Sequence, residues 1–140
     1  IQLTLSQRVP VSGAVIVTTP QDIALLDARK GLRMFQRVEV PVLGVVENMA
    51  TYCCPNCGHE AHVFGEGGGA RLAEQYDVEL LGSLPLSAAI RAQADGGTPT
   101  VIADPESDAA LRYRDIARRA AARLAYAPVA AFPDIEVSED

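Results

Sequence analysis

Three short apolar runs, separated by segments with helical spacing, constrain the fold of this 140-residue chain most strongly. The runs cover residues 14–18, 42–47 and 79–84, and their Val, Leu and Ile residues predict strands. The first run, AVIVT, is expected to be buried on both faces. A helix is expected over residues 23–36, with Asp22 as its N-cap. Because strands and helices alternate, the sequence predicts an α/β fold with a thin parallel sheet and right-handed crossovers.

The second half of the chain is expected to be mostly helical. Its predicted elements are a helix over 70–76, a helix over 88–94 capped by Ser87, a short extended piece over 100–103 and a helix from 104–107 to about 125. Residues 1–125 would form one domain. Residues 126–140 carry four acidic and no basic residues, which predicts a mobile acidic tail.

The composition excludes several classes of protein. Hydrophobic residues make up 49% of the chain, which is enough for a core, and the formal net charge of −6 argues against a nucleic-acid partner. No apolar run approaches the roughly 20 residues needed to cross a bilayer, so no membrane partner is expected. Three clustered cysteines do not make a disulfide framework, and free thiols favour a reducing cytoplasm.

Residues 47–69 concentrate the side chains that could carry chemistry. This stretch holds all three cysteines and both histidines: Cys53, Cys54, Cys57, His59 and His62. Cys54 and Cys57 form a CxxC pair, a spacing at which one turn directs two thiolates toward one metal ion. Pro55 and Gly58 suit such a turn. The sequence therefore predicts a metal-binding loop between two regular elements.

Two cysteines supply only half of a tetrahedral sulfur site, which leaves three interpretations. A second copy of the chain could supply the other pair for zinc or for a [4Fe–4S] cluster. His59 and His62 could complete a small zinc site within one chain. The pair could also be a redox dithiol or inert, although a redox CxxC is expected to open a helix, and a Gly-His-Glu loop follows here.

Two further features of this stretch have simpler interpretations. The run at residues 65–69, GEGGG, follows a loop and has no lysine after it, so it does not match a phosphate-binding loop. We expect it to be a flexible hinge at the start of a helix. Glu47 is interpreted as a solvated strand end, and Cys53 as an extra thiol beside the pair.

Five blocks in order resemble the C-terminal half of the Mrp/ApbC family, which are MinD-like P-loop ATPases that carry iron–sulfur clusters. The blocks are GAVIVTTPQDIALLDARKGLRMF, VPVLGVVENM, CPNCG with HVFGEGGGARLA, LLGSLPL and IRAQADGGTPTV. The resemblance covers residues 1–125 and implies the C-terminal half of a doubly wound, mainly parallel-sheet P-loop NTPase fold with three α/β/α layers. Since the chain starts at Ile1, we interpret it as a piece of a longer protein.

The resemblance also implies a function and its residues. Cys54 and Cys57 would bind a [4Fe–4S] cluster shared by a homodimer, which passes the cluster to apo-proteins under the control of ATP and magnesium. Asn48 would contact the adenine, and Pro85 with Leu86 would wrap the base. The alternative is a structural zinc module that joins two chains and transfers nothing.

This chain departs from the family pattern in one large respect. The family's phosphate-binding loop, its lysines and its magnesium-binding aspartates all precede the position that matches Ile1. The chain alone is therefore expected not to hydrolyse ATP. The strand at residues 14–18 would have an unpaired edge, which leads either to self-association or to cover by residues 1–11.

Overall fold

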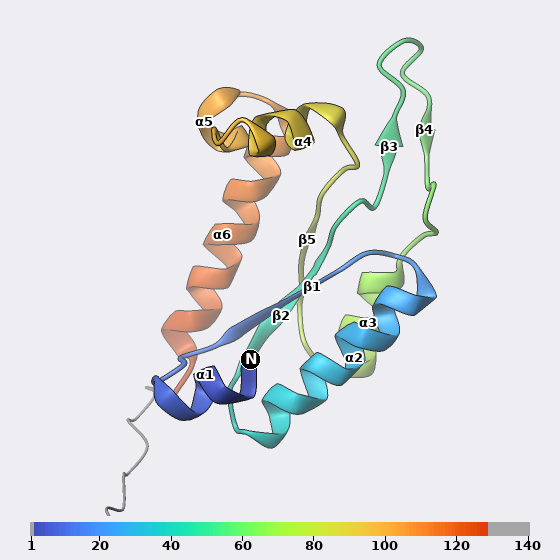
Figure 1. Cartoon of the computed structure of the whole chain (residues 1–140). Helices are drawn as coiled ribbons and strands as arrows, with labels where there is room; N and C mark the ends of the chain where they lie inside the picture. Colours follow the sequence, from blue (N-terminus) through green and yellow to red (C-terminus); the bar gives the residue numbers. More distant parts are fainter. Residues whose placement is uncertain (1, 129–140) are drawn as a thin grey trace, which may run out of the picture.

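The computed structural model describes residues 2–128; residues 1 and 129–140, and with them most of the predicted tail, lie outside the described part. Figure 1 shows the arrangement of the elements. In chain order they are α1 (Gln2–Arg8), β1 (Ala14–Thr18), α2 (Asp22–Arg37), β2 (Val42–Glu47), β3 (Tyr52–Cys53), β4 (Glu60–Ala61), α3 (Gly68–Gln75), β5 (Leu80–Ser83), α4 (Ala88–Asp95), α5 (Thr100–Ala103) and α6 (Asp108–Tyr126).

The main sheet has three parallel strands in the order β1-β2-β5, which confirms the predicted α/β fold. The carboxyl ends of the strands are joined by backbone hydrogen bonds. Asn48 donates its N–H to the carbonyl oxygen of Thr18 at 2.7 Å, and Leu84 donates to the carbonyl oxygen of Glu47 at 2.9 Å. The segments that follow all three strands therefore meet at one edge, where ligands bind in open α/β sheets.

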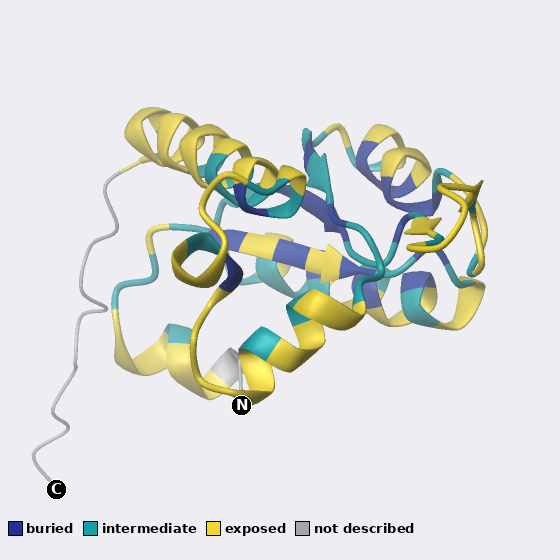
Figure 2. Ribbon diagram, turned by 90° about the horizontal axis from the view of Figure 1, so that it is seen from above, coloured by how far each residue is buried: buried dark blue, intermediate teal, exposed yellow. Residues whose placement is uncertain are grey.

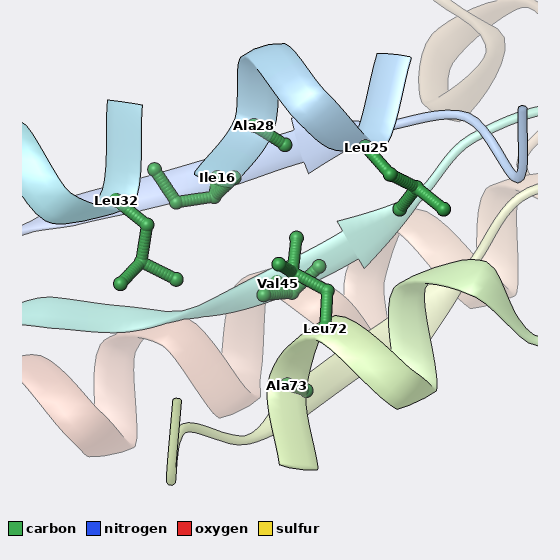
Figure 3. Close-up of a cluster of buried hydrophobic side chains, with 7 residues drawn as sticks. All are labelled: Ile16, Leu25, Ala28, Leu32, Val45, Leu72 and Ala73. Atoms are coloured by element: carbon green, nitrogen blue, oxygen red, sulfur yellow. The ribbon is translucent and has the colours of Figure 1, made fainter. Parts of the chain in front are cut away.

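One face of the sheet is covered by α2 and α3. Figure 3 shows the buried side chains that meet there, which come from β1, β2 and both helices: Ile16, Leu25, Ala28, Leu32, Val45, Leu72 and Ala73. Leu32 and Val45 have no exposed surface. Leu25, Ala28 and Leu32 recur at helical spacing, so α2 presents one apolar stripe to the sheet.

The other face is covered by α6, which packs on β5 and β2 but leaves β1 uncovered. Val46, Leu81 and Leu84 form this second core with Tyr113 and Ile116 of α6. On β1, buried and exposed residues alternate, and Val15 and Val17 are 38% and 60% exposed (Figure 2). The prediction that this strand is buried on both faces is therefore wrong, because α6 covers only the β2 and β5 side.

Three helix predictions need correction. The N-cap of α2 is Gln21, and Asp22 is the first residue of the helix. A carboxylate at this position is stabilised by the positive end of the helix dipole. The residues at 100–103 form the short helix α5 instead of an extended piece, since Ala103 N donates to the carbonyl oxygen of Pro99 at 2.9 Å. The last helix starts at Asp108 and ends at Tyr126, so it includes the first residue assigned to the tail.

Serine side chains cap the two longer helices of the second half. Ser87 caps α4 as expected, with its Oγ accepting from the backbone N–H of Ile90. Ser107 caps α6 in the same way by accepting from Ala110 N at 3.2 Å. The sequence placed Ser107 only within the starting segment of that helix, so the structure adds its role as the cap.

The first residues do not add a strand to the free edge of β1. Within residues 2–128, the only strand hydrogen-bonded to β1 is β2, and the N-terminal segment folds as α1. A groove of about 900 Å³ runs along β1 and α2 and is lined in part by Val15, Val17 and Met34.

None of the helices within residues 2–128 is long and apolar enough to cross a membrane.

Candidate metal-binding hairpin

The cysteines lie on an ordered β-hairpin, where the sequence predicted only a loop. Strands β3 and β4 pair antiparallel, with Tyr52 opposite Ala61 and Cys53 opposite Glu60. At the tip, Cys54 N donates to the carbonyl oxygen of His59 at 2.9 Å, and Gly58 N donates to the carbonyl oxygen of Cys54 at 2.8 Å. The hairpin projects from the body of the molecule, and most of its residues are exposed (Figures 1 and 2).

Gly58 allows the tight turn at this tip. Its φ angle of 71° lies in the left-handed region, which residues with a Cβ adopt only with strain. The same turn returns the chain toward β4 directly after the CxxC pair, so both cysteines stay at the exposed end of the hairpin.

The structure brings Cys54 and Cys57 together. The backbone N–H groups of Asn56 and Cys57 and the thiol of Cys57 donate hydrogen bonds to the sulfur of Cys54, and they lower the pKa of this thiol. Such donors favour the thiolate, which is the form that ligates metal. Cys54 is half-buried and Cys57 is exposed, so a ligand can approach the pair from solvent.

Cys53 is not part of this pair. Its Sγ donates a weak hydrogen bond to the carbonyl oxygen of Gly58 at 3.7 Å. The hydrogen bonds that lower the pKa of the Cys54 thiol come from Asn56 and Cys57, and none of them comes from Cys53. This arrangement fits the interpretation of Cys53 as an extra thiol.

The histidines do not complete a metal site with the cysteines. The Nδ1 atom of His62 lies 3.1 Å from the carbonyl oxygen of Ala50, and its Nε2 faces the carboxylate of Glu66 at 3.8 Å. Within residues 2–128, no three His, Cys, Asp or Glu side chains gather as a metal site. The one-chain zinc site that the sequence left open is therefore not assembled by the described residues.

The root of the hairpin is attached to the end of β5. Ala50 N donates to the carbonyl oxygen of Leu84 at 2.9 Å, and Leu86 N donates to the carbonyl oxygen of Thr51 at 2.7 Å. The structure thus places Asn48, Pro85 and Leu86, which the resemblance linked to a base, at the same sheet edge as the hairpin root.

The side chain of Asn48 also stabilises the start of the hairpin. Its Oδ1 accepts from the backbone N–H of Met49 at 2.9 Å, and Met49 has a left-handed φ of 55°. A left-handed conformation is uncommon for a residue with a long side chain and marks a turn that its surroundings hold in place.

Two predictions about residues 47–69 are wrong. Glu47 is only 5% exposed, and its Oε2 accepts from the backbone N–H of Gly69 at the start of α3. Gly68 and Gly69 are buried, and a Cβ would lie 2.9 Å from Pro20 O at Gly68 and 2.8 Å from Glu47 Cβ at Gly69. A helix does start in this run, as expected, but Gly68 and Gly69 permit the close packing of α3 and are not part of a flexible hinge.

The family described as "ParA: NUBPL iron-transfer P-loop NTPase" matches residues 1–121 of the chain. The chain belongs to this family. The expected resemblance is thereby confirmed, and the P-loop NTPase relationship agrees with the parallel sheet and its covering helices.

Curated relatives within the NUBPL-type P-loop NTPases are similar over most of this chain. An "Iron-sulfur cluster carrier protein" from Pseudomonas fragi is 68% identical over 117 residues, which are 84% of this chain and 41% of the relative. The protein of that name from Escherichia coli (strain K12) is 59% identical and covers 89% of this chain and 34% of the relative. "Iron-sulfur cluster transfer protein NUBPL" from Mus musculus is 50% identical over 91% of this chain and 40% of the relative.

Solved structures give the same assignment of the fold. A nucleotide-binding protein from Archaeoglobus fulgidus in complex with ADP superposes with a TM-score of 0.57 at 37% identity, over 69% of this chain and 39% of that one. The cell division ATPase MinD of Pyrococcus furiosus superposes with a TM-score of 0.60 at 25% identity, over 77% and 41%. The chain therefore spans less than half the length of the proteins that it matches.

Proposed function

We propose that this chain is the cluster-binding part of an iron–sulfur carrier that holds one [4Fe–4S] cluster between two copies of the protein. Cys54 and Cys57 of each copy would supply the four thiolates. The proposal depends most on the fact that these two thiols lie together at an exposed hairpin tip. Among residues 2–128, no group of three potential metal ligands forms, so one chain supplies only two thiolates. The names of the bacterial and mouse relatives support an iron–sulfur cargo.

The position of the cysteines favours transfer over permanent storage. A cluster held at the hairpin tips is accessible to solvent, so the thiolates of an apo-protein can replace the carrier's thiolates one at a time. Each replacement exchanges one iron–sulfur bond for another and needs no change in the redox state of the cluster. The hydrogen bonds to the sulfur of Cys54 lower the pKa of this thiol and so favour its departure as a thiolate. Because free thiols must persist, we place the protein in a reducing cytoplasm.

A nucleotide would bind beside the root of the hairpin. We propose that Asn48 contacts the adenine and that Pro85 and Leu86 pack against the base, with ATP and magnesium held by segments of the longer protein. The oxygen of the Asn48 amide is engaged by Met49 N, so its NH₂ group would be the donor to the base. The shared edge, and the 2.7 Å bond between Leu86 N and Thr51 O, support communication between nucleotide and hairpin.

Anaerobic reconstitution with iron and sulfide tests this function. The carrier predicts a brown protein with broad absorbance near roughly 400 nm and loss of the cluster on addition of an apo-acceptor. A colourless protein that retains zinc and joins two chains would support the alternative, a structural zinc module. Thiolates bind both metals, so the measurement, and not the ligand type, has to decide between them.

A further inference from the structure

Glu47 is a buried carboxylate to which the proposed function gives no role. It is the last residue of β2, it is 5% exposed, and it accepts the N–H of Gly69 at the first turn of α3. A carboxylate at a helix N-terminus is favoured by the helix dipole and by the unpaired N–H groups there. Burial of a charged group is costly, so this hydrogen bond is the feature that offsets the cost.

The position of this contact gives it a second consequence. The chain leaves the sheet at Glu47, forms the whole cysteine hairpin, and returns to the body of the molecule at Gly69, in the first turn of α3. The hydrogen bond between these two residues therefore closes the segment 48–68 at its base. The outgoing arm is attached to the sheet through Ala50 N and Leu84 O. The returning arm is joined to the outgoing arm by the contact of His62 with Ala50 O, and it is joined to the body of the molecule where it enters α3.

The glycine at position 69 fits this interpretation. The atoms nearest to where its Cβ would stand belong to the Glu47 side chain, with Glu47 Cβ at 2.8 Å and Oε2 at 3.1 Å. A side chain at position 69 would push the carboxylate away from the N–H that it accepts. The two residues are thus matched to each other in size as well as in hydrogen bonding.

We infer that Glu47 is a positioning residue for the metal-binding hairpin. Its carboxylate fixes the start of α3, which fixes the returning arm and so the orientation of the CxxC tip toward a second copy. This inference rests on the proposed function for its link to the cluster, but the effect on the hairpin itself does not depend on any metal. Outer residues that orient metal ligands commonly change metal affinity by about 10–100-fold when they are removed.

The experiment compares Glu47→Ala with Glu47→Gln and with Glu79→Ala. Gln retains an oxygen that can accept from Gly69 N. Glu79 is a matched control, because its carboxylate binds Arg123 at 2.7 Å at the opposite end of the sheet. Two quantities are measured below the melting temperature of every variant: amide hydrogen exchange at Cys54, Gly58 and Val45 without metal, and the rate of iron loss to a chelator after reconstitution.

The inference predicts that Glu47→Ala speeds iron loss by about tenfold or more. Amide hydrogen exchange should also become faster at Cys54 and Gly58, and it should change less at Val45 in the core. Glu47→Gln stays close to the unsubstituted chain, and Glu79→Ala changes neither quantity at the hairpin. The inference would be overturned if Glu47→Ala left hydrogen exchange at Cys54 and Gly58 unchanged. It would also be overturned if Glu79→Ala sped exchange and iron loss as much as Glu47→Ala does. If the unsubstituted chain takes up no iron, the proposed function fails, and the exchange data alone decide the role of Glu47.

Discussion

The thiol of Cys57 donates a hydrogen bond to the sulfur of Cys54 at the tip of the hairpin. The backbone N–H groups of Asn56 and Cys57 also donate to this sulfur, and together these hydrogen bonds lower the pKa of the Cys54 thiol. The two thiols are therefore neighbours at the tip, whereas the thiol of Cys53 contacts the carbonyl oxygen of Gly58.

Replacing either member of the pair should abolish cluster binding. Cys54→Ala and Cys57→Ala each remove one of the two thiolates that a chain contributes, so the iron and sulfide content should fall to background after reconstitution. Cys53→Ala is the matched control and should keep the full content, because its thiol contacts the carbonyl oxygen of Gly58 and is not among the donors to the Cys54 sulfur. Retention of iron by both pair variants, or its loss in the control, would contradict the assignment.

The acid–base behaviour of Cys54 provides a second test. The donors around its sulfur lower the pKa, so the thiolate should persist to a lower pH than an ordinary thiol and disappear as the pH falls through that lowered value. Alkylation of Cys54 by iodoacetamide, followed by peptide mass spectrometry, should show this as a midpoint below that of an unstructured cysteine peptide. Cys57→Ala removes one donor and should move the midpoint upward; a midpoint that does not move would be inconsistent with the contact.

Gly69→Ala should destabilise the fold. The added Cβ lies 2.8 Å from Glu47 Cβ, so the buried carboxylate or α3 has to shift, at a cost of about 1–3 kcal/mol. Gly31→Ala is the control, since its Cβ would meet no heavy atom within 4 Å in the interior of α2, and it should stabilise by about 1 kcal/mol. Urea unfolding measures both changes, and equal effects at the two positions would refute the packing argument.

The uncovered face of β1 should promote self-association without metal. Val15 and Val17 are exposed beside the groove between β1 and α2, and apolar patches of this kind favour contact between chains. Light scattering after gel filtration, in chelator and reductant, should show a mass that rises with concentration, and Val17→Lys should reduce this rise. Ile23→Lys changes a residue of α2 that is 74% exposed outside this face, and it should have no such effect. If both substitutions reduced self-association equally, the face of β1 would not be the contact surface.

The sequence was informative where local pattern determines structure. The apolar runs located β1, β2 and β5, and the spacing of Leu25 and Leu32 located the buried stripe of α2. The CxxC spacing located the thiols that the fold brings together. Each of these features depends on residues that are close in the chain, so a single sequence contains the information.

The errors concern features that depend on distant segments. Whether Val17 is buried depends on how far α6 reaches across the sheet. The burial of Glu47 depends on its hydrogen bond with Gly69, which lies 22 positions later in the first turn of α3. The run of glycines suggested mobility, yet Gly68 and Gly69 pack closely against Pro20 and Glu47. The hairpin pairing was missed because its strands are only two residues long and have no alternating pattern.

Native mass spectrometry of the anaerobically reconstituted chain gives the clearest decision on the shared cluster. Two chains, each contributing Cys54 and Cys57, should appear as one species that carries four iron and four sulfide ions, as the composition of a [4Fe–4S] cluster requires. Mixing with a Cys54→Ala/Cys57→Ala double variant should give no cluster-bearing mixed pair. A complete cluster on a single chain, or on a mixed pair, would contradict the proposal that the site forms only between two copies.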